Sequence, residues 1–219
     1  MKEELTQIRS SLFAGIAGDD LLGVLGCVGY HIRSFQKGEV IAFDREPMRY
    51  VGVVLRGAVD MVKEDVWGNR SLLLRCRVDD VFGETFACGT DDISSVSFLA
   101  AEESRVLFLS FGRVMRTCSH ACEHHQKLVE NMVRVIADKN RELMQKVEII
   151  SKKSLREKIL SYLSHYAQRS ASSEFEIPLG RIELADYLCA DRSALTRELA
   201  KMREEGLVEF DKNRFRLLS

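Results

Sequence analysis

Residues 112–150 form a stretch without proline and without glycine beyond Gly112. A stripe with alternating spacings of four and three residues runs along it, through His125, Val129, Met132, Ile136, Lys139, Leu143, Lys146 and Ile150. This spacing is typical of a heptad seam, and a helix of about 38 residues would be ~57 Å long. Because a small domain cannot cover so long a helix, we expect part of the stripe to pair with a second copy of the chain. The alternative is that the stripe packs only on the rest of the same chain, and Lys139 and Lys146 either weaken the seam or mark where the helix leaves it.

Before this helix, the chain reads as short strands separated by glycines. The alternation of apolar and polar residues at 58–63 is typical of a half-buried strand, and Gly68-Asn69 predicts a tight turn after it, because glycine accepts a positive φ. Further strands are expected at 40–43, 51–55 and 72–74, with a second strand pair at 96–99 and 105–109. Many short strands with glycine turns indicate a closed roll or barrel. A helical opening is expected before them, at Leu5, Ile8, Leu12 and Phe13.

After the long helix, helix and turn signals follow one another closely. Ser154 and Glu157 fit a capping box, which marks the start of a helix. The expected segments after it are a helix at 181–188, a tight turn at Cys189-Ala190, a helix at 192–204 capped by Asp191 and ended by Gly206, and a hairpin of 207–210 with 215–218. Two short helices joined by a tight turn and followed by a hairpin are typical of a winged helix-turn-helix.

The second of these short helices is apolar on one side and basic on the other. Leu195, Leu199 and Met202 are expected to face inward. Arginine side chains on the outer side suit DNA, because arginine can donate two hydrogen bonds to guanine. The predicted DNA-contacting residues are Asp191, Arg192, Ser193, Thr196, Arg197 and Lys201 on the helix, with Lys212 and Arg214 at the hairpin tip. The alternative is that the arginines are solvated and the winged helix contacts a protein. Residues 151–219 hold 13 basic and 11 acidic side chains, a balance that does not by itself establish a nucleic-acid partner.

The order of these pieces resembles the cyclic-AMP receptor protein / fumarate-nitrate reduction regulator (Crp/Fnr) family of bacterial transcription factors over nearly the full length. The pieces that carry the resemblance are the glycine-punctuated strands, Val81-Phe82-Gly83-Glu84, the long helix, Leu184-Ala185-Asp186-Tyr187-Leu188 and the stretch from Asp191 to Arg197. The resemblance implies an α+β fold. Its parts would be an effector-sensing, cyclic-nucleotide-binding-like β-roll (a double-stranded β-helix) at 1–110, a dimerisation helix at 111–150 and a winged helix-turn-helix at 151–219.

The same resemblance bears on individual positions. It implies that Arg192 and Arg197 contact bases or phosphates. Ser193 stands where many members carry a base-reading glutamate, so the usual target sequence of the family is not expected here. Cys189 stands where many members have glycine.

In cyclic-nucleotide binders of this family, the glutamate of Phe-Gly-Glu holds the ribose, and an arginine about ten residues later holds the cyclic phosphate. Glu84 is present, but Ser94 stands in the place of the arginine, and Asp91 and Asp92 would repel a phosphate. Because an unpaired buried charge is costly, we predict that the chain binds no cyclic nucleotide. We expect an unidentified small effector that favours one arrangement of the DNA-binding domains. Its expected pocket is lined by Phe82, Gly83, Glu84, Thr85, Ser94, Ser95, Met132 and Ile136.

The six cysteines are scattered and are expected to be mostly reduced, structural thiols. An iron–sulfur sensor needs about four cysteine ligands. In the oxygen-sensing relatives most of these lie near the N-terminus, whereas no cysteine precedes Cys27 here. Cys118, Cys122 and His125 share one helical face and could suit zinc or haem, but a single helix seldom supplies a full ligand set. We therefore expect no metal, iron–sulfur cluster or haem, and a redox role for Cys118 and Cys122 stays open.

Composition excludes several classes. The longest uncharged apolar run, residues 21–30, has ten residues, whereas a membrane span needs about 20. We therefore expect no membrane association and a cytoplasmic location. No catalytic triad or phosphate-binding glycine loop is recognisable, so we do not expect an enzyme. The prediction is a homodimeric, sequence-specific regulator that binds double-stranded promoter DNA and a small effector, with RNA polymerase as a further candidate partner. The alternative is a ligand-binding regulatory subunit whose winged helix contacts a protein.

Overall fold

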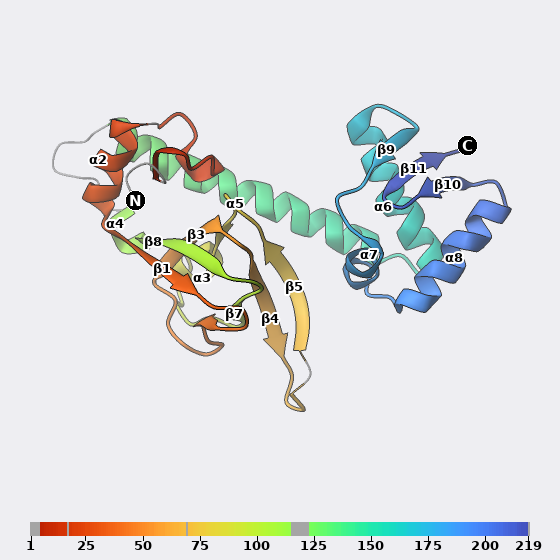
Figure 1. Ribbon diagram of the computed structural model, residues 1–219, viewed down its shortest axis with the longest axis horizontal. Coiled ribbons are helices and arrows are strands. Elements are labelled where there is room, and N and C mark those ends of the chain that lie inside the picture. Colours follow the sequence, from red (N-terminus) through yellow and green to blue (C-terminus); the bar gives the residue numbers. More distant parts are fainter. Residues whose placement is uncertain (1–4, 17, 69, 115–122, 219) are drawn as a thin grey trace. The chain divides into compact units, whose positions relative to one another are not determined.

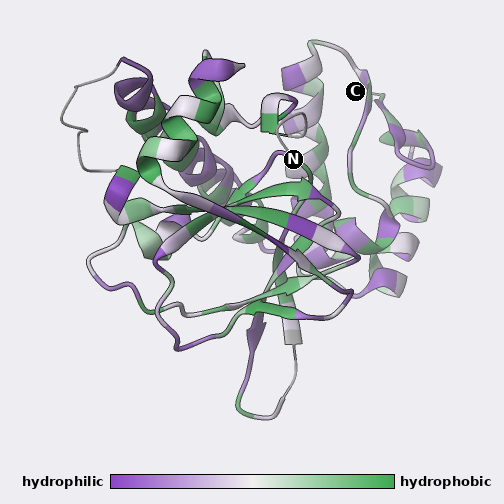
Figure 2. Ribbon diagram, turned by 60° about the vertical axis from the view of Figure 1, so that its left-hand side comes forward, coloured by the Kyte–Doolittle hydropathy of each residue, from purple (hydrophilic) through white to green (hydrophobic). Residues whose placement is uncertain are grey.

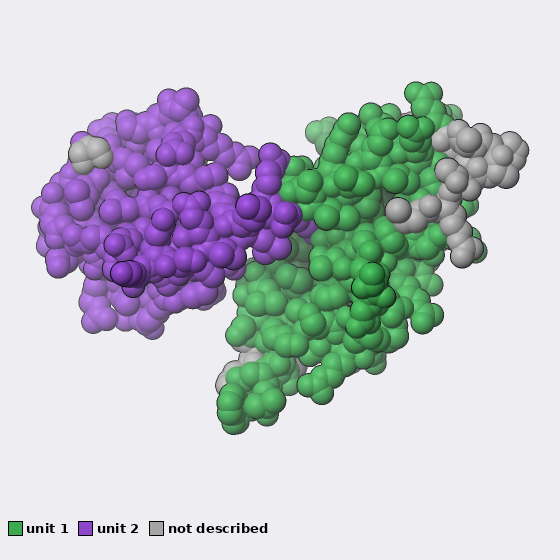
Figure 3. Space-filling model, turned by 180° about the vertical axis from the view of Figure 1, so that it is seen from behind, with its two compact units in different colours: residues 1–138 green, residues 139–219 purple. Residues whose placement is uncertain are grey.

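The computed structural model describes residues 5–218 except 17, 69 and 115–122. The chain divides into two compact units, Met1–Asp138 and Lys139–Ser219, which Figures 1 and 3 show. The division falls within a long helix, and the expected domain boundaries at 110/111 and 150/151 stay predictions. Within the described residues, no helix is both long enough and apolar enough to cross a membrane.

The first unit contains two four-stranded antiparallel sheets. In the first sheet the order is β1 (Tyr30–Phe35), β8 (Ser104–Ser110), β3 (Tyr50–Arg56) and β6 (Val81–Phe82). In the second sheet the order is β2 (Val40–Ala42), β7 (Ser97–Ala100), β4 (Val59–Glu64) and β5 (Arg70–Cys76). One buried cluster draws side chains from both sheets, among them Phe35, Phe82, Phe98 and Phe108. The predicted α+β fold with a β-roll is confirmed. Figure 2 shows that hydrophobic residues recur along its strands.

The hairpin of β4 and β5 forms as predicted, with Met61 opposite Leu74 and Val62 opposite Leu72. The amide of Gly68 (φ 83°) donates to the carbonyl of Asp65, whereas Asn69 lies outside the described residues. The expected pairing of 96–99 with 105–109 is wrong. These residues form β7 and β8, which pair with β2 and β4 in one sheet and with β1 and β3 in the other. Alternation identifies a strand and its faces but not its neighbours, so it could not show that residues 101–103 cross between sheets.

Among the described residues, the 3-10 turn Ser11–Phe13, α2 (Asp19–Val28) and α4 (Phe111–Val114) accompany the first sheet. Of the expected helical opening, Leu5 is helical and Leu12 and Phe13 lie in the 3-10 turn; α2 was not predicted from the sequence. Leu12, Leu21 and Leu25 pack in one cluster with Val53 and Leu107 of the first sheet. Because this sheet is covered on both faces, β3 and β8 read as continuous apolar runs. A short helix, α3 (Glu84–Ala87), follows β6.

The described part of the long helix is α5 (Glu123–Ile150), 28 residues long. Of the helix expected at 112–150, residues 112–114 and 123–150 are helical, and residues 115–122 lie outside the described part. His125 and Met132, expected in a seam with a second chain, are only 3% and 2% exposed, because they pack inside the first unit. The exposed apolar side chains are Val133, Ile136, Leu143, Met144 and Val147, of which Ile136 and Leu143 belong to the expected seam. The helix thus carries two apolar faces, and the expected seam joined residues of both.

The second unit follows the expected segments closely. It contains α6 (Leu155–Ser170), β9 (Glu174–Glu176), α7 (Arg181–Tyr187), α8 (Arg192–Glu204), β10 (Val208–Asp211) and β11 (Arg214–Leu217). The capping box is present: the Ser154 hydroxyl accepts the Glu157 amide at 3.2 Å, and the Ser154 amide donates to the Glu157 carboxylate at 2.9 Å. The three strands form one antiparallel sheet in the order β10-β11-β9. The core is built from one face of each helix, including Leu163, Leu184 and Leu199.

Candidate functional site

A tight turn joins α7 to α8. Cys189 has a φ of 52°, a conformation that glycine adopts at little cost and other residues seldom adopt. The amide of Ala190 donates to the carbonyl of Ala185 at 2.9 Å. Leu188 and Leu195 on either side are fully buried, so the turn holds α8 against α7 and fixes which face of α8 is outward.

Asp191 begins α8 as its N-cap. Its Oδ1 accepts hydrogen bonds from the amides of Ser193 and Ala194 at 2.8 and 3.0 Å, and from the Ser193 hydroxyl at 2.5 Å. The Ser193 hydroxyl, followed by the two amides, holds the pKa of the Asp191 carboxyl below its usual range. Asp191 and Ser193 are thus engaged with each other, and their first role is to fix the start of α8. Thr196 similarly donates its hydroxyl to the carbonyl of Arg192 at 2.9 Å.

Helix α8 carries four exposed cations, Arg192, Arg197, Lys201 and Arg203. Arg197 and Lys201 lie opposite the buried Leu195 and Leu199, whereas Arg192 begins the helix and Arg203 lies over the Phe210 ring. Neither Arg192 nor Arg197 forms an ion pair with any residue that the structure describes. A capped helix that presents extended cations to solvent can enter a groove lined by phosphates and base edges.

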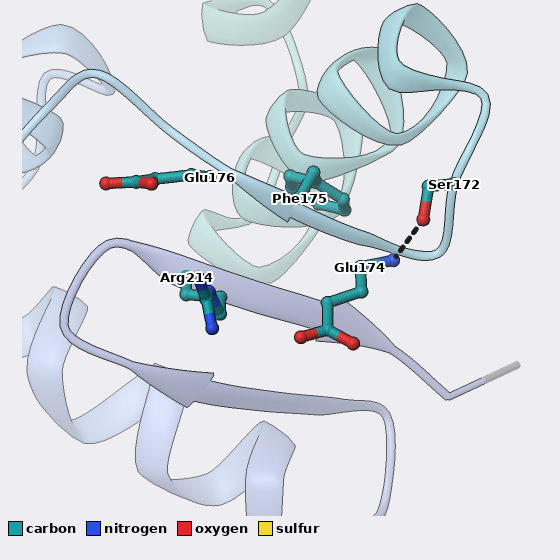
Figure 4. A pocket seen from close by; sticks show the side chains of 5 residues that line it. All are labelled: Ser172, Glu174, Phe175, Glu176 and Arg214. Carbon is teal, nitrogen blue, oxygen red and sulfur yellow. Dashed lines mark hydrogen bonds between the residues drawn. The ribbon is translucent and has the colours of Figure 1, made fainter.

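The hairpin of β10 and β11 carries two cations that the sequence predicts to contact DNA, and their surroundings differ. Lys212 lies in the turn with a φ of 52° and is exposed. Arg214 lies on β11 directly opposite Glu176 of β9. A shallow depression of about 420 Å³ is lined by Arg214 and Glu176 together with Ser172, Glu174 and Phe175, as Figure 4 shows. Lys212 is therefore open to solvent, whereas Arg214 has an acidic neighbour on the next strand.

The sequence analysis did not single out Arg181, which lies at the start of α7. Its guanidinium lies 4.9 Å from the ring centre of Phe210 and 5.7 Å from that of Phe215. Its Nη2 donates to the carbonyl of Lys212 at 3.4 Å. Burial lowers the pKa of Arg181. Because both rings belong to the hairpin, this arginine ties the hairpin to α7, and the sequence gives no local signal for such a long-range contact.

In the first unit, aromatic rings fill the space between the two sheets. The Phe82 ring centre lies 5.1 Å from that of Phe98 and 6.3 Å from that of Phe108. A Cβ on Gly52 would lie 2.4 Å from the Phe82 ring, and a Cβ on Gly83 (φ 79°) would lie 2.1 Å from Cε of Met48. Phe82, Gly83 and Glu84 are all buried. The interior of the roll at these residues is therefore closely packed.

The loop that carries the family's phosphate-binding position is closed by its own hydrogen bonds. The Ser94 hydroxyl donates to the carbonyl of Val96 at 2.7 Å, and Ser94 is only 1% exposed. Asp92 accepts from Nε of Arg49 at 2.8 Å. The exposed Ser95 accepts from Lys63 through its carbonyl, and Lys63 also pairs with Asp44 at 3.0 Å. Arg49 and Lys63 near this loop are thus paired with carboxylates of the same chain.

The structure does not bring together all residues of the expected effector pocket. Phe82 belongs to the core between the sheets, whereas Met132 belongs to the core formed with α2 and the first sheet. Ile136 is 38% exposed on α5. Thr85 is exposed, and its hydroxyl donates to the Glu84 carboxylate at 3.5 Å.

The interpretation of Cys118 and Cys122 falls outside the described residues. Among the described cysteines, burial and then Glu84 raise the pKa of Cys88 to about 12. His125 Nε2 lies 2.7 Å from the carbonyl of Val114, and its Nδ1 lies 3.8 Å from Sγ of Cys27. Over the described ranges, no three His, Cys, Asp or Glu side chains are grouped so as to hold a metal ion.

Comparison with known proteins matches both units. The cyclic nucleotide-binding domain matches residues 32–120, and the Crp-like helix-turn-helix domain matches residues 157–219. The transcriptional activator protein FnrL of Cereibacter sphaeroides is 24% identical over 221 residues, which is 94% of this chain and 84% of FnrL. The structure of FixK2 from Bradyrhizobium japonicum is similar with a TM-score of 0.58 and 19% identity, over 87% of this chain and 93% of FixK2. The catabolite activator protein of Thermus thermophilus has a TM-score of 0.55 and 20% identity, over 95% of this chain and 93% of its own.

Proposed function

Since the chain belongs to the Crp/Fnr family of transcription regulators, we propose that it is a homodimeric regulator that binds specific DNA sequences through α8. The observation that carries this proposal is the set of exposed cations on α8, Arg192, Arg197 and Lys201. Arg192 is the first residue of the helix and would approach base edges with the helix N-terminus leading. Lys212 would contact a phosphate from the hairpin. We place this activity in the cytoplasm, where promoter DNA of a bacterium lies, with RNA polymerase as a further partner.

Support for a homodimer comes from the exposed stripe of α5. Val133, Ile136, Leu143 and Val147 are 62%, 38%, 61% and 58% exposed. With Asn140 they follow spacings of three, four, three and four residues, which is the heptad pattern. Asn140 would stand at one seam position, where a polar residue specifies register at some cost in stability. A second copy of this chain would present the same apolar stripe, and the two stripes would pack against each other about a twofold axis.

The experiment that tests the proposal is selection of binding sites from random DNA duplexes by the purified full-length protein. We expect enrichment of an inverted repeat whose half-sites lie about 34 Å apart. The affinity for this duplex should fall steeply with salt, since neutralised phosphates release counterions. No enrichment of any sequence, together with a stable protein partner, would instead favour the regulatory-subunit alternative.

We further propose that the effector is not a cyclic nucleotide. The packed rings around Phe82 support this, and so does Ser94, which stands in the place of the arginine and donates its hydroxyl to Val96, so a phosphate would lack a cationic partner at this position. Adding 1 mM cyclic AMP or cyclic GMP should leave both the Tm and the DNA affinity unchanged. A ligand at about 100 times its Kd would stabilise the fold by about 2.7 kcal/mol, so an upward shift of several degrees would contradict this part of the proposal. Native mass spectrometry of the purified protein would report any retained ligand.

A further inference from the structure

Arg156 connects the first turn of α6 to two points on α8. Its Nε donates to Oε1 of Glu198 at 2.6 Å. Its Nη1 and Nη2 donate to the two carboxylate oxygens of Glu205 at 2.6 and 3.1 Å. The three side chains are 31%, 24% and 38% exposed. All three guanidinium nitrogens are therefore engaged, and the contact with Glu205 is bidentate, the stronger form of this pair.

The two carboxylates that Arg156 binds lie next to the cations proposed to contact DNA. Glu198 lies three residues before Lys201, and Glu205 lies four residues after it, spacings at which side chains of a helix meet. Glu205 is also the C-cap of α8, where a negative charge is unfavourable because the helix dipole is negative there. The hydrogen bond from Arg156 holds the pKa of Glu205 below its usual range, with Lys201 as a weaker contributor.

We propose that Arg156 is a positioning residue for DNA recognition, which holds α8 against α6 and keeps Glu198 and Glu205 from pairing with Lys201. This inference rests on the proposed function of α8. Without Arg156, Glu198 and Glu205 are free to pair with Lys201, and both carboxylates add negative charge beside the phosphates. Lys201 would then be neutralised by its own helix instead of by DNA.

The test compares Arg156→Ala with the triple variant R156A/E198Q/E205Q, on the duplex selected by the wild-type protein. We expect Arg156→Ala to weaken binding by ~10-fold or more. Its salt slope should be shallower by about 1, because a lost phosphate contact of Lys201 removes about one unit. The triple variant should regain most of the affinity and the wild-type slope, since it lacks the competing carboxylates. Arg156→Lys should fall between, because lysine keeps the charge but not the bidentate geometry.

The matched control is Lys153→Ala, which removes one exposed positive charge three residues before Arg156 and should bind DNA like the wild type. Circular dichroism melting checks that each variant is folded, and Arg156→Lys decides the question if Arg156→Ala does not fold. The proposal is overturned if Arg156→Ala binds as tightly as the wild type, or if the triple variant stays as weak as Arg156→Ala, which is the result that a purely structural role gives. Failure of the wild-type protein to bind any duplex would instead refute the function proposed for α8.

Discussion

Replacing Leu143 and Val147 with glutamate should yield a folded monomer that no longer binds an inverted-repeat duplex tightly. Both side chains are exposed on α5, at 61% and 58%, so the chain itself loses little packing. In a dimer they would face the same stripe of the partner, where buried like charges are strongly unfavourable. Because the second half-site is bound at high effective concentration only in the dimer, loss of pairing should weaken DNA binding by ~10²–10⁴-fold. Sedimentation and a DNA titration measure the two effects.

The control for this variant replaces Arg134 and Gln145 with glutamate. By the helical spacing of α5, these two residues lie away from the exposed apolar stripe. This variant should remain a dimer and retain most of its DNA affinity. If the Leu143 and Val147 variant also sediments as a dimer, the exposed stripe is not the dimer interface.

Replacing Arg197 with alanine should weaken binding to the selected duplex by about 1–3 kcal/mol, which is ~5–150-fold. The reason is that Arg197 is exposed on the outer face of α8, where a paired hydrogen bond to guanine would be lost. The loss should be largest for the preferred sequence and small for unrelated duplexes, so specificity should relax. A gel-shift titration with both kinds of duplex measures it.

Lys212→Ala is the comparison for this second variant, because lysine at the hairpin tip would contact only the phosphate backbone. It should weaken binding to all duplexes by a similar factor and reduce the salt slope by about 1. Equal affinity of Arg197→Ala and the wild type on the selected duplex would remove Arg197 from the recognition surface.

The winged helix-turn-helix could be predicted almost completely from the sequence because its signals are local. Ser154 and Asp191 cap helices through bonds to residues two or three positions away, and Gly206 adopts a positive φ just after α8. The residues of α8 that we propose to contact DNA followed from the same local periodicity. The role of Arg156 could not be predicted in this way. Its partners Glu198 and Glu205 are 42 and 49 residues away in the sequence, and nothing near Arg156 marks them.

The β-roll could be predicted only in part. The strands were recognisable, but the sheet to which β7 or β8 belongs depends on contacts across the roll. Helix α2 contains Gly23 and Gly26, which are poor helix formers, and it is stabilised by the packing of Leu21 and Leu25. The division of α5 into a buried and an exposed face likewise depends on what packs against it.

The close fit of Phe82 against Gly52 limits the evolutionary routes open to this chain. Residue 82 could not shrink to alanine without a cost of about 3–5 kcal/mol, a large fraction of the stability of a domain. Residue 52 could not acquire a side chain unless the ring moved, since its Cβ would lie 2.4 Å from that ring. A lineage that enlarged the space between these two sheets would need coordinated replacements at several sites, so descendants reached by single mutations should keep the closely packed interior.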